Sequence, residues 1–417
     1  MVIAGIVIVV ATFIAIIKQF ETRLVLLLSG LLMCFIGGQL SAGTTAFVKE
    51  LTNPGLVPTI CTVLGFSYVM EYTKCTEHMV YFISAGLKKM TKIIIPGAVI
   101  ITFLINIALP TAAGCAAAVG ALLIPALIRS GVHPAMAGSA IFLGTWGSAL
   151  SPGLMFNPQV AQLAGEDVMT VIASFSMQAI IGIVVAAILL NIVAIVKKEH
   201  TGYVLKDANE AEGKEFKVNY LYAIIPIIPL VLLVLGSKQV AVIPEISVPV
   251  SMLIGTAIGI IAVRPNVTEA VKKFFRGTGD GMCDVVGLMA AAAAFTAGMQ
   301  YIGLTNALID GMKNSQQIAQ IGAAFGPFLL AVISGSGNAA ALAFNGAVTP
   351  HAADFGYGIM QLGSMAQLGA GIGRSMSPVA GAGIIIAGLA GINPMEMAKR
   401  NAVPCIIATV VIMLLLL

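Results

Sequence analysis

Apolar residues run along this chain in long blocks, separated by short polar segments. Runs of about 17 to 25 apolar residues recur over the whole length, and each is long enough to cross a hydrocarbon core of about 30 Å as a helix. The first, "VIAGIVIVVATFIAIIK", opens at residue 2. We expect ten full crossings, at 2–17, 22–38, 57–72, 134–153, 168–196, 219–236, 247–263, 280–301, 357–391 and 402–417.

Two further apolar stretches, 93–128 and 318–350, are interrupted near their middle. The breaks are "LPTAAGC" at 109–115 and "SGSGN" at 334–338, and each half is short for a full crossing. Such broken segments fit re-entrant helical hairpins, which enter and leave on one side and need shelter from protein or a water-filled cavity at their tip.

Composition agrees with this pattern. The 417 residues are 59% hydrophobic and only 10% charged, and the mean hydropathy is +1.00, so we expect an all-α integral membrane protein without a sizeable soluble domain. The first run lacks a basic n-region and a cleavage site, and we interpret it as a retained crossing. The six cysteines lie mostly in apolar runs without CxxC spacing, which is typical of buried small side chains and predicts no disulfide or metal site.

The basic residues predict the orientation of these crossings. With both hairpins in place, 18 of the 22 fall on one side, which we assign to the cytoplasm, so both termini are expected outside. They are Lys18, Arg23, Lys74, Lys88, Lys89, Lys92, Arg129, Lys197, Lys198, Lys206, Lys214, Lys217, Arg264, Lys272, Lys273, Arg276, Lys399 and Arg400. Lys49, Lys238 and Lys313 fall on the other side, and Arg374 falls inside a crossing. This placement explains the net charge of +4 without a nucleic-acid partner.

A polar segment divides the chain into two halves. Residues 197–218 mix lysines with acidic residues and are expected to form a cytoplasmic linker. Residues 1–196 would form a first repeat, with the hairpin 93–128 and a broken span at 134–165. Residues 219–417 would form a second repeat, with the hairpin 318–350 and a broken span at 357–391.

Short matches relate the two halves in the same order, at offsets of 223 to 229 residues. They are "FSYVMEYTKCT" (66–76) with "FTAGMQYIGLT" (295–305), "GCAAA" (114–118) with "GNAAA" (337–341), and "SALSPG" (148–153) with "RSMSPV" (374–379). Five crossings and a hairpin in each half reverse the orientation of the second copy. Inverted repeats with broken helices at the bilayer midplane are typical of secondary transporters.

Four elements should therefore converge at the midplane: two hairpin tips and two interrupted spans. Proline removes a backbone donor, so "SP" inside a span leaves free carbonyls for a cation, and the next half-helix presents its N-terminus to a carboxylate. Close helix packing is the alternative explanation for such small residues. The candidate substrate-binding residues are Thr111, Gly114, Cys115, Ser148, Ser151, Ser334, Gly335, Ser336, Gly337, Asn338, Arg374, Ser375 and Ser377.

Arg374 is the sharpest single candidate. A guanidinium inside a membrane is costly and needs an anionic partner or a water-filled cavity. It can pair with a substrate carboxylate through its planar fork, form a structural ion pair, or snorkel from a helix end. Asp280 and Asp284 begin a predicted crossing, either as ordinary helix N-terminal charges or as cation or proton sites.

Other chemistries find less support. None of the four histidines has metal-ligand spacing, and no serine has an evident base, so we expect no enzyme and no cofactor. A Na⁺/H⁺ antiporter would be expected to carry acidic residues at the hairpin tips, which have none. Carriers of another organic anion or of an amino acid remain open.

Three stretches resemble the DcuC family of anaerobic C4-dicarboxylate carriers: "YAIIPIIPLVLLV" (222–234), "SGSGNAAALAF", and "LGAGIGRSMSPVAGAGIIIAGLAGINPMEMAKRNAVP". The family's GSGN and GR-[ST]-x-SP-V-[AS]-G signatures stand at Gly335–Asn338 and Gly373–Gly381. The resemblance implies a bacterial inner-membrane carrier that exchanges or exports succinate, fumarate or malate, with Na⁺ or H⁺ as candidate coupling ions. It also implies a homodimer of the elevator type, with a fixed scaffold and a moving transport domain that carries the hairpins.

Overall fold

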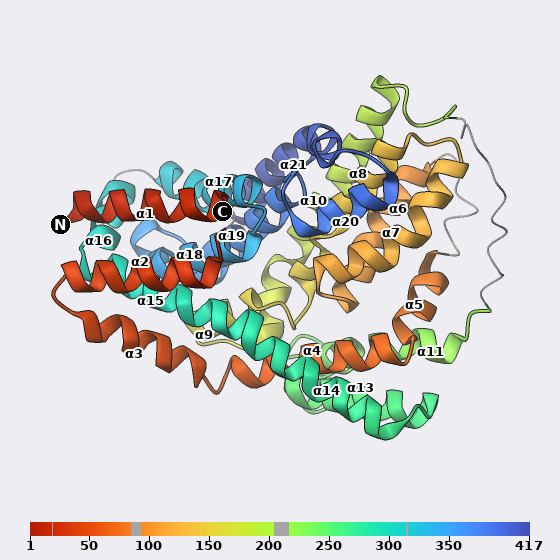
Figure 1. Cartoon of the computed structure of the whole chain (residues 1–417), viewed down its shortest axis with the longest axis horizontal. Coiled ribbons are helices and arrows are strands. Elements are labelled where there is room, and N and C mark those ends of the chain that lie inside the picture. Colours follow the sequence, from red (N-terminus) through yellow and green to blue (C-terminus); the bar gives the residue numbers. More distant parts are fainter. Residues whose placement is uncertain (19, 85–92, 204–216, 314–315) are drawn as a thin grey trace.

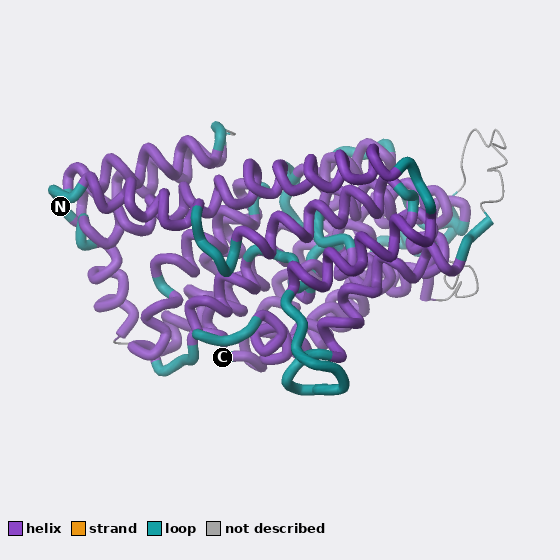
Figure 2. The backbone as a smooth tube through the Cα atoms, turned by 90° about the horizontal axis from the view of Figure 1, so that it is seen from below, coloured by secondary structure: helices purple, strands orange, loops and turns teal. Residues whose placement is uncertain are grey.

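The structure is a computed structural model, which describes residues 1–18, 20–84, 93–203, 217–313 and 316–417. Within these ranges the chain is helical with connecting loops and contains no strand (Figure 2), so the all-helical expectation is confirmed. Several residues used in the sequence analysis lie outside the described ranges: most of the linker (204–216), with Lys206 and Lys214, and the loop lysines Lys88, Lys89 and Lys92.

The helices of the first half follow one another closely. They are α1 (Val2–Ile17), α2 (Thr22–Ile36), α3 (Leu40–Leu51), α4 (Val57–Tyr72), α5 (Cys75–Ser84), α6 (Ile94–Ala108), α7 (Ala112–Arg129), α8 (Pro134–Gly144), the 3₁₀ turn η3 (Gly147–Leu150), α9 (Phe156–Ala164) and α10 (Val168–Val196).

The second half begins with a short broken helix. The second half comprises α11 (Tyr220–Ile224), η4 (Ile225–Ile227), α12 (Ile228–Leu235), α13 (Val248–Val263), α14 (Val267–Asp280), the π-turn η5 (Gly281–Val286), α15 (Gly287–Tyr301), α16 (Leu304–Lys313), α17 (Gln316–Ser334), α18 (Gly337–Ala347), η6 (Thr349–Phe355), α19 (Ile359–Arg374), α20 (Gly381–Ala390) and α21 (Pro394–Leu416).

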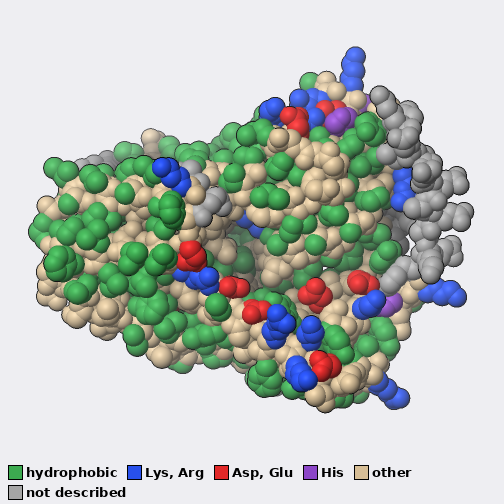
Figure 3. All heavy atoms as spheres, in the orientation of Figure 1, with side chains coloured by type: hydrophobic (Ala, Val, Ile, Leu, Met, Phe, Trp, Pro, Cys, Tyr) green, Lys and Arg blue, Asp and Glu red, His purple; other side chains and the backbone are tan. Residues whose placement is uncertain are grey.

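Five helices in the described part of the chain are long and apolar enough to cross a membrane: Ala112–Arg129, Val168–Val196, Val267–Tyr301, Gln317–Ser334 and Pro394–Leu416. Two of them, α7 and α17, are halves of the interrupted stretches, so the expectation that each half is short for a full crossing is wrong for these two. Hydrophobic side chains cover much of the visible face, while charged ones gather in its lower and right-hand parts (Figure 3). Ile3, Phe35 and Ile261 are more than 60% exposed, which suits a surface facing lipid rather than water.

The main helix contacts fall into two groups, and Figure 1 shows α15 beside α2 and α3 in the first of them. In one, α15 lies against α2 and α3, and α4 lies against α13 and α14. In the other, α17 packs on α19, α10 on α21, α7 on α20 and α6 on α8. Helices α2 and α15 approach so closely that a Cβ on Gly30 would lie 2.5 Å from the Phe295 amide nitrogen, so only glycine fits there. A contact between α15 and α18 links the groups.

One prediction about helix boundaries is wrong. Asp280 and Asp284 do not stand at a helix N-terminus, because α14, η5 and α15 form one continuous helix from Val267 to Tyr301. The polar residues of α14, such as Glu269 and Lys272, end the apolar run without ending the helix. The length of an apolar run indicates how much of a helix can lie within a membrane, whereas the ends of the helix are set by backbone hydrogen bonding and caps. Helices α3, α5 and α16 were missed for the same reason.

The chain is interrupted at both Ser-Pro positions. Helix α8 stops at Gly144 and α9 begins at Phe156, with Ser151 and Pro152 between them. Helix α19 stops at Arg374 and α20 begins at Gly381, with Ser377 and Pro378 between them.

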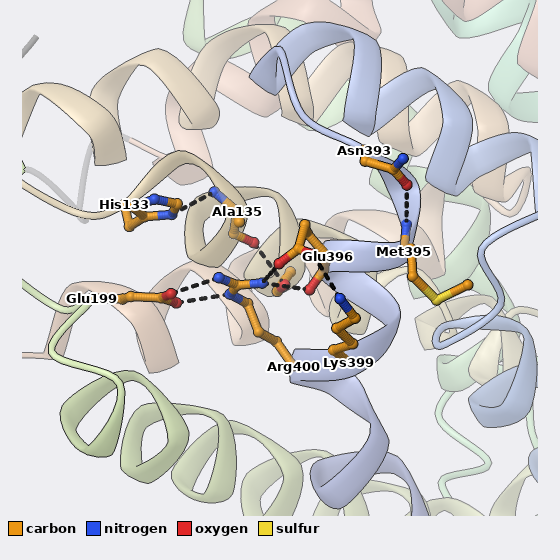
Figure 4. A network of polar contacts seen from close by, with 9 residues as sticks. His133, Ala135, Glu199, Asn393, Met395, Glu396, Lys399 and Arg400 are labelled. Carbon is orange, nitrogen blue, oxygen red and sulfur yellow. Dashed lines mark hydrogen bonds and ion pairs between the residues drawn. The ribbon is translucent and has the colours of Figure 1, made fainter.

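A buried ion-pair network ties the start of α21 to the loop after α10 (Figure 4). Arg400 donates from Nε to Glu199 Oε2 at 2.7 Å and from Nη1 to Glu396 Oε2 at 2.8 Å. The Arg400 side chain is only 6% exposed. Removing one partner would leave the buried Arg400 charge unpaired, which is costly. The network therefore holds α21 to α10 at one end of the contact between them.

Candidate functional site

A cavity of about 390 Å³ lies where the four interrupted elements meet. The loop between α6 and α7 contributes Pro110 and Thr111, and the loop between α17 and α18 contributes Gly335 and Ser336. The breaks after α8 and α19 contribute Ser148 and Arg374, and α4 closes one wall with Ile60, Val63 and Leu64. A volume of this order suits a small organic molecule.

The structure brings together seven of the thirteen candidate residues. Those that line the cavity are Thr111, Ser148, Gly335, Ser336, Gly337, Asn338 and Arg374. They come from both hairpin tips and both broken spans, which are far apart in the sequence.

The other six candidates do not line this cavity. Ser151 lines a smaller neighbouring cavity with Pro152, and Gly114 lies against the Thr111 hydroxyl. Cys115 is fully buried and its thiol faces the Thr102 carbonyl at 3.8 Å. The hydroxyls of Ser334, Ser375 and Ser377 take part in local bonds, to the Leu330 carbonyl, the Gly371 carbonyl and the Val379 amide. Gly114, Cys115 and Ser334 lie beside the hairpin tips, and Ser151, Ser375 and Ser377 lie in the two broken spans.

The second tip shows why its sequence contains glycine. Gly335 adopts φ +73°, and a Cβ on it would lie 2.8 Å from the Val379 carbonyl oxygen and 2.9 Å from the Ala380 nitrogen. Only glycine combines this left-handed conformation with so close an approach. Ser336 then caps α18, and its hydroxyl accepts a hydrogen bond from the Ala339 amide at 3.4 Å.

The first tip is held to the first broken span by Asn106. Its Nδ2 donates to the Leu109 carbonyl at 2.9 Å, and its Oδ1 accepts from the Ser148 amide at 2.7 Å. Asn106 is fully buried. One carboxamide therefore fixes the position of Thr111 and α7 relative to Ser148.

Arg374 supplies the charge of the site. It is the last residue of α19, is half-buried, and donates from Nη2 to the Thr145 carbonyl at 2.7 Å. No acidic side chain in the described ranges pairs with it, and none lines the cavity. The structural ion pair considered from the sequence is therefore not formed among these residues.

The N-termini of two helices add to this positive potential. Helix α7 begins at the cavity with Ala112, and α18 begins there with Gly337 and Asn338. The first amides of a helix lack intrahelical acceptors and carry partial positive charge. The Asn338 carboxamide has no hydrogen-bond partner in the described part of the chain and can donate into the cavity. Together these groups place positive charge and hydrogen-bond donors around the cavity.

Two lining residues with polar side-chain atoms were missed in the sequence. Trp146, the only tryptophan, and Gln367 line the cavity and are each 1% exposed. Trp146 Nε1 and Gln367 Oε1 find no hydrogen-bond partner among the described residues. Gln367 could have been found by periodicity, because Gln367, Gly371 and Arg374 stand at i, i+4 and i+7 and share a helix face. Trp146 lies in a non-helical break, where no period applies.

No metal centre emerges from the described residues. They contain no group of three or more histidine, cysteine, aspartate or glutamate side chains that could hold a metal ion. Of the cysteines, Cys283 is exposed and the other five are buried.

The fold is similar to that of a solved membrane transporter. It matches the crystal structure of the Alcanivorax borkumensis YdaH transporter with a TM-score of 0.61 over 89% of this chain and 87% of that one, at 14% sequence identity.

Within that class, the model of the C4-dicarboxylate anaerobic carrier family, DcuC, matches residues 2–417, and the chain belongs to this family. It is 26% identical to the anaerobic C4-dicarboxylate transporter DcuC of Escherichia coli strain K12, over 98% of this chain and 94% of that one. It is 38% identical to an uncharacterized transporter of Haemophilus influenzae, over 64% of this chain and the full length of that one. The family and these relatives are transporters, so the chain is a multi-pass membrane transporter and not an enzyme.

Proposed function

We propose that this protein is a secondary transporter of C4-dicarboxylates such as succinate, fumarate and malate, and that the cavity around Arg374 is its substrate site. The observation that carries the proposal is the guanidinium at the cavity without an acidic partner among the described residues. A buried or half-buried cation of this kind is costly unless an anion joins it. A substrate carboxylate would supply that anion.

The second carboxylate needs its own partners. Asn338, the start of α18 and the start of α7 stand around the same cavity. Helix N-termini and carboxamide donors stabilise carboxylates at low dielectric. One arginine and two helix ends would therefore balance most of a dianion, and co-bound Na⁺ or H⁺, or exchange against another dicarboxylate, would balance the rest.

The order of helices supports an inverted repeat. Helices α2 to α10 and α13 to α21 follow the same succession, in which a hairpin pair is followed by a broken span and a long terminal helix. Residues with positive φ recur at helix ends in pairs about 226 residues apart: Gly38 with Arg264, Lys74 with Gly303, Gly131 with Gly356, and Gly165 with Gly391. In our proposal the α6–α7 and α17–α18 pairs are re-entrant hairpins that enter from opposite faces.

Transport would then follow alternating access of the elevator type. The second helix group, which carries both hairpin pairs, would move against the group that contains α2, α3, α4, α13, α14 and α15. We further propose a homodimer in a bacterial inner membrane, with both termini outside the cytoplasm.

Counterflow in proteoliposomes tests this function. Vesicles loaded with unlabelled succinate should accumulate labelled succinate, fumarate or malate, with and without a Na⁺ or pH gradient to identify coupling. If no C4-dicarboxylate exchanges under any gradient, the substrate proposal is wrong. Accumulation of a monocarboxylate or an amino acid instead would favour the alternative carriers considered from the sequence.

A further inference from the structure

Gln367 is a buried polar residue at the cavity whose acceptor is unused. Its side chain is 1% exposed and lines the cavity. Its Nε2 donates to Asn157 Oδ1 at 2.9 Å, whereas its Oε1 finds no donor in the described part of the chain. Leaving a buried acceptor unpaired destabilises the folded protein, so such an atom calls for a partner.

The direction of this carboxamide is set by its neighbour. Asn157, fully buried, donates from Nδ2 to the carbonyls of Ala149 and Ser151, both at 2.8 Å. Two carbonyl acceptors admit only an NH₂ group on that side, so the Asn157 oxygen must face Gln367. The Gln367 nitrogen then faces Asn157, and its oxygen is the atom left over. A flipped Gln367 would bring two oxygens together.

We propose that Gln367 Oε1 is a specificity-determining acceptor that reads a hydrogen-bond donor on the carbon chain of the substrate. This inference rests on the proposed function of the cavity. An ionised carboxylate has only acceptors and cannot satisfy this oxygen. A hydroxyl or ammonium group between the two carboxylates can, so the site favours 2-hydroxy or 2-amino C4-dicarboxylates over unsubstituted ones.

Burial makes this contact selective. Because the Gln367 side chain is nearly covered, only a group seated against the cavity wall can donate to it. A site built to bond a hydroxyl rejects the analogue that lacks it, since its own polar atom is then left unpaired. Asn157 acts as a positioning residue, through Gln367.

Competition counterflow tests the inference. Uptake of labelled malate would be competed by malate, aspartate and succinate at about pH 8, where the carboxyl groups of all three are ionised. We expect malate or aspartate to compete about tenfold more strongly than succinate, which corresponds to one unpaired buried acceptor. The two arms identify whether hydroxyl or ammonium is the donor that is read.

The variant Gln367→Met keeps an unbranched side chain and removes the acceptor. We expect the preference over succinate to fall to about one, because malate and aspartate then lose a contact that succinate does not make. The matched control is Gln178→Met. Because Gln178 lines a separate cavity, this variant should keep the tenfold preference.

The preference is measured on the wild-type protein, so a poorly folding variant does not leave the inference untested. Equal competition by succinate, malate and aspartate on the wild-type protein would overturn it. A preference that survives Gln367→Met would overturn the role of Gln367. If no dicarboxylate exchanges at all, the proposed function itself fails, which is a separate and distinguishable result.

Discussion

The guanidinium of Arg374 has one observed acceptor, the Thr145 carbonyl at 2.7 Å. A single neutral acceptor uses one of its five N–H donors and leaves its charge uncompensated. Thr145 follows α8, and Arg374 ends α19, so this bond joins the two broken spans. Arg374 therefore has both a structural bond and free donors on the cavity side.

Replacing Arg374 tests its role in substrate binding. We expect Arg374→Ala to weaken dicarboxylate binding about 100-fold, because a charge-assisted hydrogen bond contributes roughly 1.5–3 kcal/mol. Arg374→Lys keeps the charge without the planar fork and should recover about a tenth of wild-type affinity. The affinities can be measured by quenching of Trp146, the only tryptophan and itself at the cavity. Arg129→Ala, an exposed change at the end of α7, should bind normally; unchanged binding in Arg374→Ala would exclude pairing with substrate.

Gly335 makes a second prediction at the residue scale. Gly335→Ala would place a Cβ 2.8 Å from the Val379 carbonyl oxygen at φ +73°. The left-handed conformation alone costs about 1–2 kcal/mol, and the clash would displace the tip. We expect exchange to fall more than tenfold while the protein still folds. Gly388→Ala, where a Cβ meets open space, should exchange at the wild-type rate, and equal rates for both variants would contradict the assigned tip geometry.

The sequence identified the residues that break helices better than the residues that face the cavity. Glycine, proline and serine mark the tips at 109–115 and 334–338 because several of them stand close together there, whereas single ones such as Pro125 and Pro327 lie inside helices. Which side chain then faces inward depends on the path of the break, and Ser151 and Ser377 turned away from the cavity while Trp146 turned to it. Helical periodicity could have identified Gln367, but its side chain carries no charge that would mark it as a candidate.

At the scale of elements, the two hairpin pairs should expose both ends on the same side of the membrane. We expect Ile318→Cys and Ala353→Cys, both at exposed positions, to react with an impermeant maleimide from outside the cell. The background is Cys283→Ser, which removes the exposed cysteine and leaves the five buried ones. Labelling of the two positions from opposite sides would show that 318–350 crosses the membrane.

A polar link between elements makes a pH prediction. Asp167 caps α10 and pairs with Lys238 at 2.9 Å, and burial raises its pKa less than the bonds from Thr170 and Lys238 lower it, to about 2. A lowered folded-state pKa contributes stability above the usual pKa of about 4, and that stability is lost as the pH falls through about 2. Asp167→Asn keeps a capping oxygen and loses the pair, so we expect a loss of about 0.5–1 kcal/mol at pH 7. Thermal unfolding of both proteins should converge at the acid end, and a constant difference would contradict the assignment.

At the scale of the whole molecule, loops assigned to one side by their charges meet in space. The loops after α7 and α10 join where the His133 amide donates to the Glu199 carbonyl at 3.0 Å, and Arg400 adds the start of α21 (Figure 4). Loops assigned to the other side also meet, because Asn53 Nδ2 donates to Gln162 Oε1 at 2.9 Å. Counting basic residues could predict which loops lie on the same side, because the rule applies to whole loops. It could not predict the packing of α14 with α4, which depends on side-chain fit.

This sorting predicts that both chain ends lie outside the cytoplasm. Alkaline phosphatase fused after Leu417 should be active in cells, because it folds only outside, whereas green fluorescent protein at the same point should stay dark. Fusions after Gly202, beyond α10 and beside the Arg400 network, should give the opposite result and serve as the matched control. The reversed pattern at both points would be compatible with the same helix packing but would show that the protein lies in the membrane in the opposite orientation. The same result at both points would require an even number of crossings in the second half. The segment 318–350 would produce that number if it crossed the membrane once. The test therefore also bears on α17 and α18.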